Sequence, residues 1–248
     1  MSSLPQFLLA HPHIRRSLGI ADPPFRAPTR LVSHLNPDFT LQPYALSDEN
    51  EWQKVRSSNR DWLTPWDSTD PLNSPSINYK NWITLLSWDL LRGNGIAFTM
   101  RFHGVLVGEI SLGAMNYGAL RSAIVGYWVS HDAAGNGFAP LALAMVADWA
   151  FFAQTGPHLN RLEVDLIARN ARSRRVVEKN GFSYCGRRRA WMHVAGQWQD
   201  HEIWDLCAAD VLGVPAQTYQ PLGREVQSAA VTFPCETRLS MLANQPSR

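Results

Sequence analysis

Residues 125–140 read VGYWVSHDAAGNGFAP, and they combine an apolar strand, a short glycine-bearing loop and the start of a helix. The first amides of a helix have no intrahelical acceptor, so a loop that directs them at one point forms an anion site at the positive end of the helix dipole. Gly135 and Gly137 adopt positive φ at little cost, and Pro140 suits the first helical turn. The segment therefore predicts a site for phosphate oxygens.

A glycine pair between a strand and a helix also occurs in ordinary turns, so this segment alone leaves two interpretations open. The chain has no G-x-x-x-x-G-K-[ST] motif, which argues against a Walker-type nucleotide site. The dinucleotide-binding motif is also incomplete, because Pro140 occupies the place of its third glycine.

A second strand and helix follow along the chain. Residues 161–167 alternate as in a strand, and residues 171–180 are expected to form a short helix that ends at Gly181. With the glycine loop, this order resembles the GNAT acetyltransferases, whose pyrophosphate loop reads Q/R-x-x-G-x-G/A and whose next helix begins N-x-x-[AS] and ends before G-F. Here these motifs correspond to residues 132–137 and 170–182.

Within that superfamily, the chain is similar to the RimJ/RimL-type N-terminal acetyltransferases of ribosomal proteins. The similarity lies in the runs 126–128, 172–182, 187–189 and 196–201, and it covers about residues 39–206. It implies that the chain binds acetyl-CoA and acetylates a primary amine, such as the N-terminal α-amine of a ribosomal protein.

The alternation of elements predicts a layered α/β sheet. Strands are expected near residues 39–44, 97–102, 105–112, 123–130, 162–167, 184–193 and 201–206, with helices and a loop across 48–91 and helices at 138–153 and 171–180. The resemblance implies the GNAT fold, a mixed central sheet in which the strands 123–130 and 162–167 splay apart. We expect an N-terminal extension over 1–38 with a short helix around Arg15, the acetyltransferase domain over 39–208, and a partly ordered tail over 209–248.

Composition sets the broad class of protein. The 248 residues are 45% hydrophobic and 18% charged, which suits one large globular domain. The net charge of +2 gives no general signal for nucleic-acid binding, and no run of about 18 apolar residues predicts a membrane span. Three cysteines without C-x-x-C spacing predict reduced thiols, no metal site and a cytoplasmic setting. Separately, we expect a monomer or a homodimer.

The resemblance also implies where acetyl-CoA binds. Its pyrophosphate is expected on the amides of Gly135, Asn136, Gly137, Phe138 and Ala139, and its pantetheine along the backbone of Trp128, Val129 and Ser130 and on Asn170 and Ser173. Asn170 also suits the helix N-cap. Asp132 stands where the family has Gln or Arg, and we expect its carboxylate to point away from the pyrophosphate.

Catalysis in this family is direct attack of an amine on the thioester, which needs an oxyanion donor, a proton for the leaving thiolate and a route for the amine proton. The resemblance assigns the first role to the Val129 N–H. Val177 stands where many members have a tyrosine acid. The resemblance to the RimJ/RimL branch implies that Ser173 serves the leaving group instead, either as the acid or only as a hydrogen-bond donor to the sulfur. The usual glutamate before the loop is also missing, and Glu109 is the first replacement for the base.

Other base and substrate residues are less specific. His193, His201 and Asp200 are weaker candidates for the base. Trp62 and Trp66 resemble the tryptophan-bearing loop that these enzymes place over the acceptor groove. Tyr127 is expected to bind substrate with them. Tryptophans in such a loop equally suit the domain core.

Two other function classes remain open. They are a small-molecule amine acetyltransferase, for polyamines or aminoglycosides, and a GNAT-fold acyl-CoA binder that has lost catalysis. An enclosed acidic pocket would favour the first of these, whereas an open groove beside the tryptophan loop would favour a protein substrate.

Overall fold

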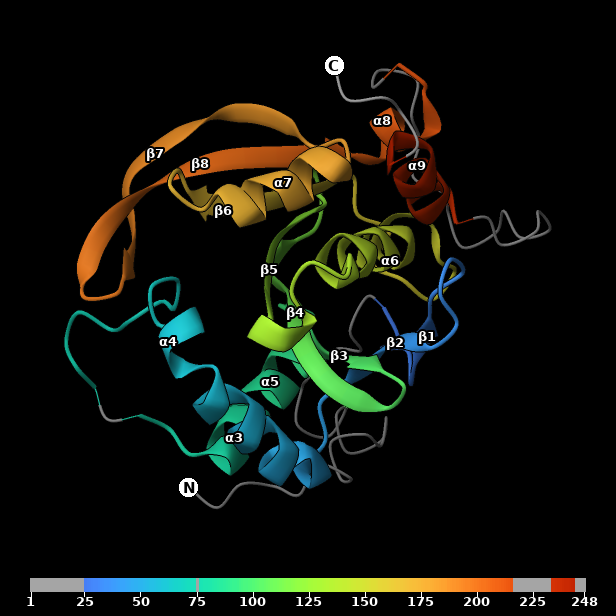
Figure 1. Ribbon diagram of the computed structural model, residues 1–248. Helices are drawn as coiled ribbons and strands as arrows, with labels where there is room; N and C mark the ends of the chain where they lie inside the picture. The colour runs from blue at the N-terminus through green and yellow to red at the C-terminus, as the bar shows by residue number, and fades with distance from the viewer. Residues whose placement is uncertain (1–24, 75, 216–232, 244–248) are drawn as a thin grey trace, which may run out of the picture.

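A computed structural model of the chain describes residues 25–74, 76–215 and 233–243 (Figure 1). These residues form one eight-stranded mixed sheet in the order β1-β2-β3-β4-β5-β6-β8-β7. The strands are β1 (Leu31–Val32), β2 (Phe39–Pro43), β3 (Ile96–Phe102), β4 (Val105–Asn116), β5 (Ser122–Val129), β6 (Arg161–Ile167), β7 (Ser183–Val194) and β8 (Gln197–Cys207). Neighbouring strands are antiparallel except for β5 and β6, which run parallel.

Helices precede and follow the central strands. They are α3 (Glu49–Ser58), α4 (Arg60–Leu63), α5 (Tyr79–Arg92), α6 (Phe138–Phe152), α7 (Ala171–Lys179), α8 (Ala208–Leu212) and α9 (Pro234–Ala243), with short 3-10 turns at Leu46–Asp48 and His131–Ala133. In the described parts of the chain, no helix combines the length and apolar character that a membrane crossing requires.

Helix α6 forms the centre of the hydrophobic core. Every residue from Phe138 to Phe151 except Ala139 is buried, as its nearly uninterrupted apolar sequence requires. Phe138 stacks on Phe39 of β2 with ring centroids 5.1 Å apart, and Trp149 packs edge-on against Phe98 of β3. The glycine loop therefore leads directly into the most buried helix of the described fold.

The fold expected from the sequence is confirmed, and the central elements begin and end within a few residues of their predicted bounds. The structure adds the short strand β1, the helices α8 and α9, and an earlier start of β8 at Gln197. Cys235 and Leu239 of α9 are part of the core, as is Phe25 of the N-terminal segment. The helix expected around Arg15 lies outside the described residues, and the domain boundaries stay a prediction.

Candidate active site

A cavity of about 830 Å³ runs between the two halves of the sheet. Its wall contains the glycine loop (Gly135, Gly137), the start of α7 (Asn170, Ser173) and the tryptophans of the α4 segment (Trp62, Trp66). Residues that the sequence assigns to the acetyl donor and to the acceptor thus line one continuous space.

The cavity exists because β5 and β6 part. Their parallel pairing covers only Ser122 to Ile124 on β5, and ends at the pair Ile124 and Glu163. Beyond that point, the edge of β5 that faces β6 has no strand beside it. The splay expected from the resemblance is present.

Val129 presents its backbone to this open edge. The Ser130 N–H donates to Val107 O at 2.8 Å. In an antiparallel ladder this bond makes Gly108 and Val129 a non-hydrogen-bonded pair. The N–H and C=O of Val129 therefore point away from β4. The Val129 carbonyl accepts a hydrogen bond from Trp62 Nε1 at 2.9 Å. Ser130 O accepts from the Ala133 N–H, so both backbone groups of Ser130 are engaged within the protein. Trp128 pairs with Glu109 on β4, so Val129 alone of the run 128–130 has backbone groups facing the opening.

The glycine loop has the geometry of an anion site. Gly135 and Gly137 have φ of +89° and +80°, and a Cβ at either position would meet open space. The first intrahelical bond of α6 runs from the Leu141 N–H to Gly137 O at 3.1 Å, so the amides of Phe138 and Ala139 have no intrahelical acceptor. These open positions and free amides fit a pyrophosphate.

Two side chains next to the loop support this fit. The Asn136 amide donates to Ala133 O at 3.1 Å and thereby closes the loop. The Asp132 side chain is fully exposed and lies 3.2 Å from His131 Nδ1, so its carboxylate points outward as expected. Among the described residues, no group of three or more His, Cys, Asp or Glu side chains is arranged to hold a metal ion.

At the start of α7, Asn170 caps the helix and Ser173 meets a tyrosine. Asn170 Oδ1 accepts from the Ser173 N–H at 3.1 Å. The Ser173 hydroxyl lies 2.8 Å from the hydroxyl of Tyr127, and burial raises the pKa of Tyr127 above its ordinary value. The sequence placed Tyr127 with the substrate residues, and its pairing with Ser173 was missed because the two are 46 residues apart in the chain.

Glu109 lies half-buried in the cavity wall, on the strand next to Val129. Tyr44 donates its hydroxyl to Glu109 Oε2 at 2.6 Å. Burial raises the pKa of Glu109, as expected, while the Tyr44 hydrogen bond and the neighbouring Trp128 side chain oppose part of the rise. Arg56 packs over the Trp128 ring and pairs with Asp67 at 2.7 Å, so its charge is shared with another carboxylate.

The weaker base candidates lie in different surroundings. His201 lines the cavity, its Nδ1 is 3.0 Å from Gln199 O, and burial lowers its pKa. His193 is bound to Thr69, and Asp200 is held by Arg187 and the Ala190 N–H.

A buried carboxylate that sequence reasoning did not single out also lines the cavity. Asp165 Oδ2 binds Arg188 and the indole of Trp191, and burial together with the neighbouring Glu163 raises the pKa of Asp165. Asp165 lies at a polar position in the alternating sequence of β6. The alternation alone does not show whether such a carboxylate faces a cavity or solvent, so the sequence did not identify it.

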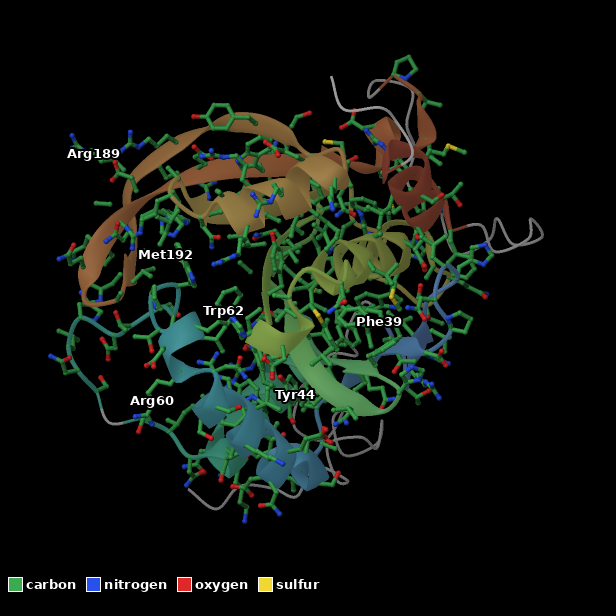
Figure 2. The ribbon with its side chains drawn as sticks, viewed as in Figure 1. Phe39, Tyr44, Arg60, Trp62, Arg189 and Met192 are labelled. Carbon is green, nitrogen blue, oxygen red and sulfur yellow. The ribbon has the colours of Figure 1, made fainter. Side chains whose placement is uncertain are left out.

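The tryptophans face cations across the cavity. The Arg172 guanidinium lies 4.2 Å from the centre of the Trp62 ring, and that of Arg169 lies 5.6 Å from the centre of the Trp66 ring. Figure 2 shows Trp62 between α4 and the end of β5, where its indole binds the Val129 carbonyl. Trp62 and Trp66 therefore line the cavity and are not part of the buried core, and their role toward a substrate stays a prediction.

One end of the cavity is closed by hydrogen bonds between the loop after α4 and the tip of the β7–β8 hairpin, which Figure 1 shows arching toward α4. Ser68 bridges to Val194, and the Thr69 N–H donates to His193 O at 2.8 Å. The Thr69 hydroxyl also accepts from the Gly196 N–H at 3.2 Å. The cavity is therefore a channel that this contact covers at one end.

Comparisons with known proteins agree with this geometry. The family model of the acetyltransferase (GNAT) domain matches residues 38–183, more than half of the chain. A solved structure of Mycobacterium smegmatis RimJ in complex with CoA-disulfide is 26% identical, with a TM-score of 0.68 over 83% of this chain and 89% of that one. The ribosomal-protein-S5-alanine acetyltransferase from Vibrio fischeri is 22% identical, with a TM-score of 0.63 over 73% of this chain and 98% of that one, a likeness of fold.

A curated relative, the probable N-acetyltransferase YjcK of Bacillus subtilis, is 36% identical over 98 residues, which are 40% of this chain and 52% of the relative. The chain spans between 52% and 60% of the length of the curated relatives it matches.

Proposed function

The chain belongs to the GNAT acetyltransferase family, and on that premise we propose that it transfers the acetyl group of acetyl-CoA to the N-terminal α-amine of a protein, such as a ribosomal protein. The observation that carries the proposal is the charge in the cavity that also contains the glycine loop: two of the three carboxylates among its described residues pair with arginines, which leaves Glu109 for a single amine. The cavity is covered at one end and is not the open groove expected for a protein substrate. A chain terminus fits a covered channel, because a terminus enters end-on whereas an internal lysine brings two flanking segments with it.

Acetyl-CoA supplies the thioester carbon, to which the acceptor nitrogen bonds as the bond to the CoA sulfur breaks. The Val129 N–H donates to the carbonyl oxygen of the reacting group, from a β5 edge with no strand beside it. Glu109 accepts the ammonium proton of the acceptor. An α-amine has a pKa near 8, so a weak base suffices at neutral pH.

Ser173 acts on the leaving sulfur. With Tyr127 as the donor of their shared hydrogen bond, the Ser173 hydroxyl is free to donate a hydrogen bond to the leaving sulfur. The proton that the acceptor nitrogen loses as the amide forms becomes the proton of the CoA thiol, so Ser173 keeps its own proton at the end of the step. Asn170 fixes the first turn of α7 and thereby holds Ser173 in place.

The charges of the cavity favour a single amine over a polycation. Among the described residues, three carboxylates line the cavity, and two of them have cationic partners: Asp67 pairs with Arg56, and Asp165 pairs with Arg188. Glu109 instead accepts a hydrogen bond from the neutral Tyr44 hydroxyl. A polyamine or an aminoglycoside carries several ammonium groups and would need several such carboxylates.

The small-molecule alternative has one observation in its favour, the closure of the channel by the loop and the hairpin tip.

One assay tests both functions. The full chain is incubated with acetyl-CoA and with each acceptor in turn, and thiol release is followed. The acceptors are peptides with a free N-terminus, the same peptides with a blocked N-terminus, polyamines and aminoglycosides.

The proposal predicts thiol release with the free peptides alone. Turnover with a polyamine or an aminoglycoside and none with the peptides would replace it with the small-molecule function. Binding of acetyl-CoA without turnover of any acceptor would mark the chain as an acyl-CoA binder.

A further inference from the structure

The Glu109 carboxylate accepts a hydrogen bond from a residue outside its own strand. Tyr44, which directly follows β2, donates its hydroxyl to Oε2 at 2.6 Å. This donor is neutral. It binds the carboxylate without cancelling its charge, which is what a group that must take a proton from an ammonium requires.

Tyr44 lies behind Glu109 as seen from the cavity, whose described wall includes Glu109 but not Tyr44. Its ring packs edge-on against Trp82 of α5, with centroids 4.8 Å apart, and Trp82 in turn packs against Trp52 and Tyr79. Figure 2 labels Tyr44 beneath β4, on the side of the sheet near α5. The aromatic cluster therefore fixes the Tyr44 ring outside the lining of the cavity.

The other charged or titratable groups around Glu109 are few. Arg56 of α3 and Asp67 act on it through their charges, and these two pair with each other at 2.7 Å. Tyr79 of α5 directs its hydroxyl to Ala45 O at 2.9 Å. Tyr44 is thus the ionisable group in direct hydrogen-bond contact with the carboxylate.

We infer that Tyr44 is a positioning residue: its hydroxyl holds the Glu109 carboxylate in place and keeps it able to accept the proton of the acceptor amine. The inference rests on the proposed function, because that function gives Glu109 its role. It adds a residue that the sequence motifs do not contain and that lies outside the cavity.

The test is Tyr44→Phe in the full chain, with kcat/KM measured from pH 6 to pH 9 on a free N-terminal peptide. The Tyr44 hydrogen bond stabilises the Glu109 carboxylate and lowers its pKa. Without that bond the pKa of Glu109 rises, so the acidic limb of the pH profile, where activity falls as Glu109 becomes protonated, moves to higher pH. A hydrogen bond to a charged group corresponds to about a tenfold effect, so we expect a loss of about tenfold at pH 6 that shrinks toward pH 9.

Tyr79→Phe is the matched control. It removes a hydroxyl from the same aromatic cluster, but that hydroxyl binds Ala45 O and not Glu109. Its acidic limb is expected to coincide with that of the wild type. In a Glu109→Gln background, Tyr44→Phe is expected to add no pH-dependent loss. A uniform loss at all pH values, or an unshifted limb, would overturn the inference and leave Tyr44 with a packing role.

The Glu109 titration can also be read without activity, from the carboxyl carbon signal of labelled protein assigned with Glu109→Gln. A titration midpoint of Glu109 that is the same in wild type and Tyr44→Phe would refute the inference even if no acceptor is turned over. An absence of peptide acetylation by the wild type would instead refute the proposed function. If Tyr44→Phe does not fold, Trp82→Leu removes the edge-on ring contact that fixes Tyr44, and an unshifted Glu109 midpoint there would equally contradict the inference.

Discussion

At the scale of single residues, Gly135 is the most direct probe of the anion site. An aspartate there would place bulk and negative charge where pyrophosphate is expected, and we expect the affinity for acetyl-CoA to fall at least about tenfold. Calorimetry measures the change. Gly118→Asp is the matched control, because that glycine also has positive φ and open space for a Cβ but lies in the turn between β4 and β5.

If the folded Gly135→Asp variant binds acetyl-CoA as tightly as Gly118→Asp, the loop is an ordinary turn. The strain of a positive φ cannot produce a difference between the two variants, because both carry it.

Ser173 gives a kinetic prediction. Ser173→Ala is expected to lower kcat by about tenfold with little change in acetyl-CoA affinity, because its hydroxyl is proposed to act mainly on the leaving sulfur. Tyr127→Phe is expected to show a smaller loss of the same kind, since Tyr127 acts through Ser173. A loss of acetyl-CoA affinity that accounts for the whole effect would show that Ser173 is a binding residue only.

How much of the site could be predicted depends on distance along the chain. The glycine loop and the Asn170 cap could be predicted because their partners lie within a few residues. The bond between Tyr44 and Glu109 joins residues 65 positions apart and leaves no periodic trace in the sequence. The same holds for Tyr127 and Ser173.

At the scale of elements, the loop after α4 and the β7–β8 hairpin close the channel together. Thr69 contributes its hydroxyl, which lies 2.7 Å from His193 Nδ1 and accepts from the Gly196 N–H. Thr69→Val keeps the volume of the side chain and removes these bonds. We expect the KM for a peptide acceptor to rise about fivefold while the affinity for acetyl-CoA is unchanged.

Steady-state kinetics with varied peptide check this prediction. Thr84→Val is the control, because it removes a threonine hydroxyl that bonds Lys80 O within α5. An unchanged peptide KM in Thr69→Val would show that the closure does not shape the acceptor channel.

The positions of most strands and helices along the chain could be predicted because strand and helix periodicities are local. The order of the strands in the sheet could not be read from periodicity, because β8 lies between β6 and β7. β1 and α9 could not, because distant partners stabilise them. Glu236 of α9 accepts from Ser33 Oγ at 2.7 Å, a contact between residues 203 positions apart. Two-residue strands such as β1 also carry too few positions for a period to be visible.

At the scale of the whole molecule, Asp148 ties α9 to the central helix. It lies within α6 and accepts from the N–H groups of Cys235 and Glu236 at 2.8 and 3.1 Å. Burial raises the pKa of Asp148 to about 6. The folded state therefore binds this proton more tightly than the unfolded chain does. As the pH rises from about 4, the ordinary pKa of Asp, to about 6, the free energy of unfolding falls.

Asp148→Asn removes this titration. We expect the variant to gain stability relative to the wild type over that pH range, by on the order of 3 kcal/mol, with a constant difference above it. Urea unfolding at a series of pH values measures this difference. Asp132→Asn, at a fully exposed side chain, is the control. A difference between Asp148→Asn and wild type that does not change with pH would contradict a raised pKa of Asp148.

The central claim is that the cavity delivers acetyl-CoA to the α-amine of a chain terminus. The most direct measurement is mass spectrometry of one peptide that carries both a free N-terminus and an internal lysine, after incubation with the full chain and acetyl-CoA. The claim predicts acetyl on the first residue, none on the lysine, and no product when the N-terminus is blocked. Acetylation of the lysine instead, or an unmodified peptide beside an acetylated polyamine, would contradict it.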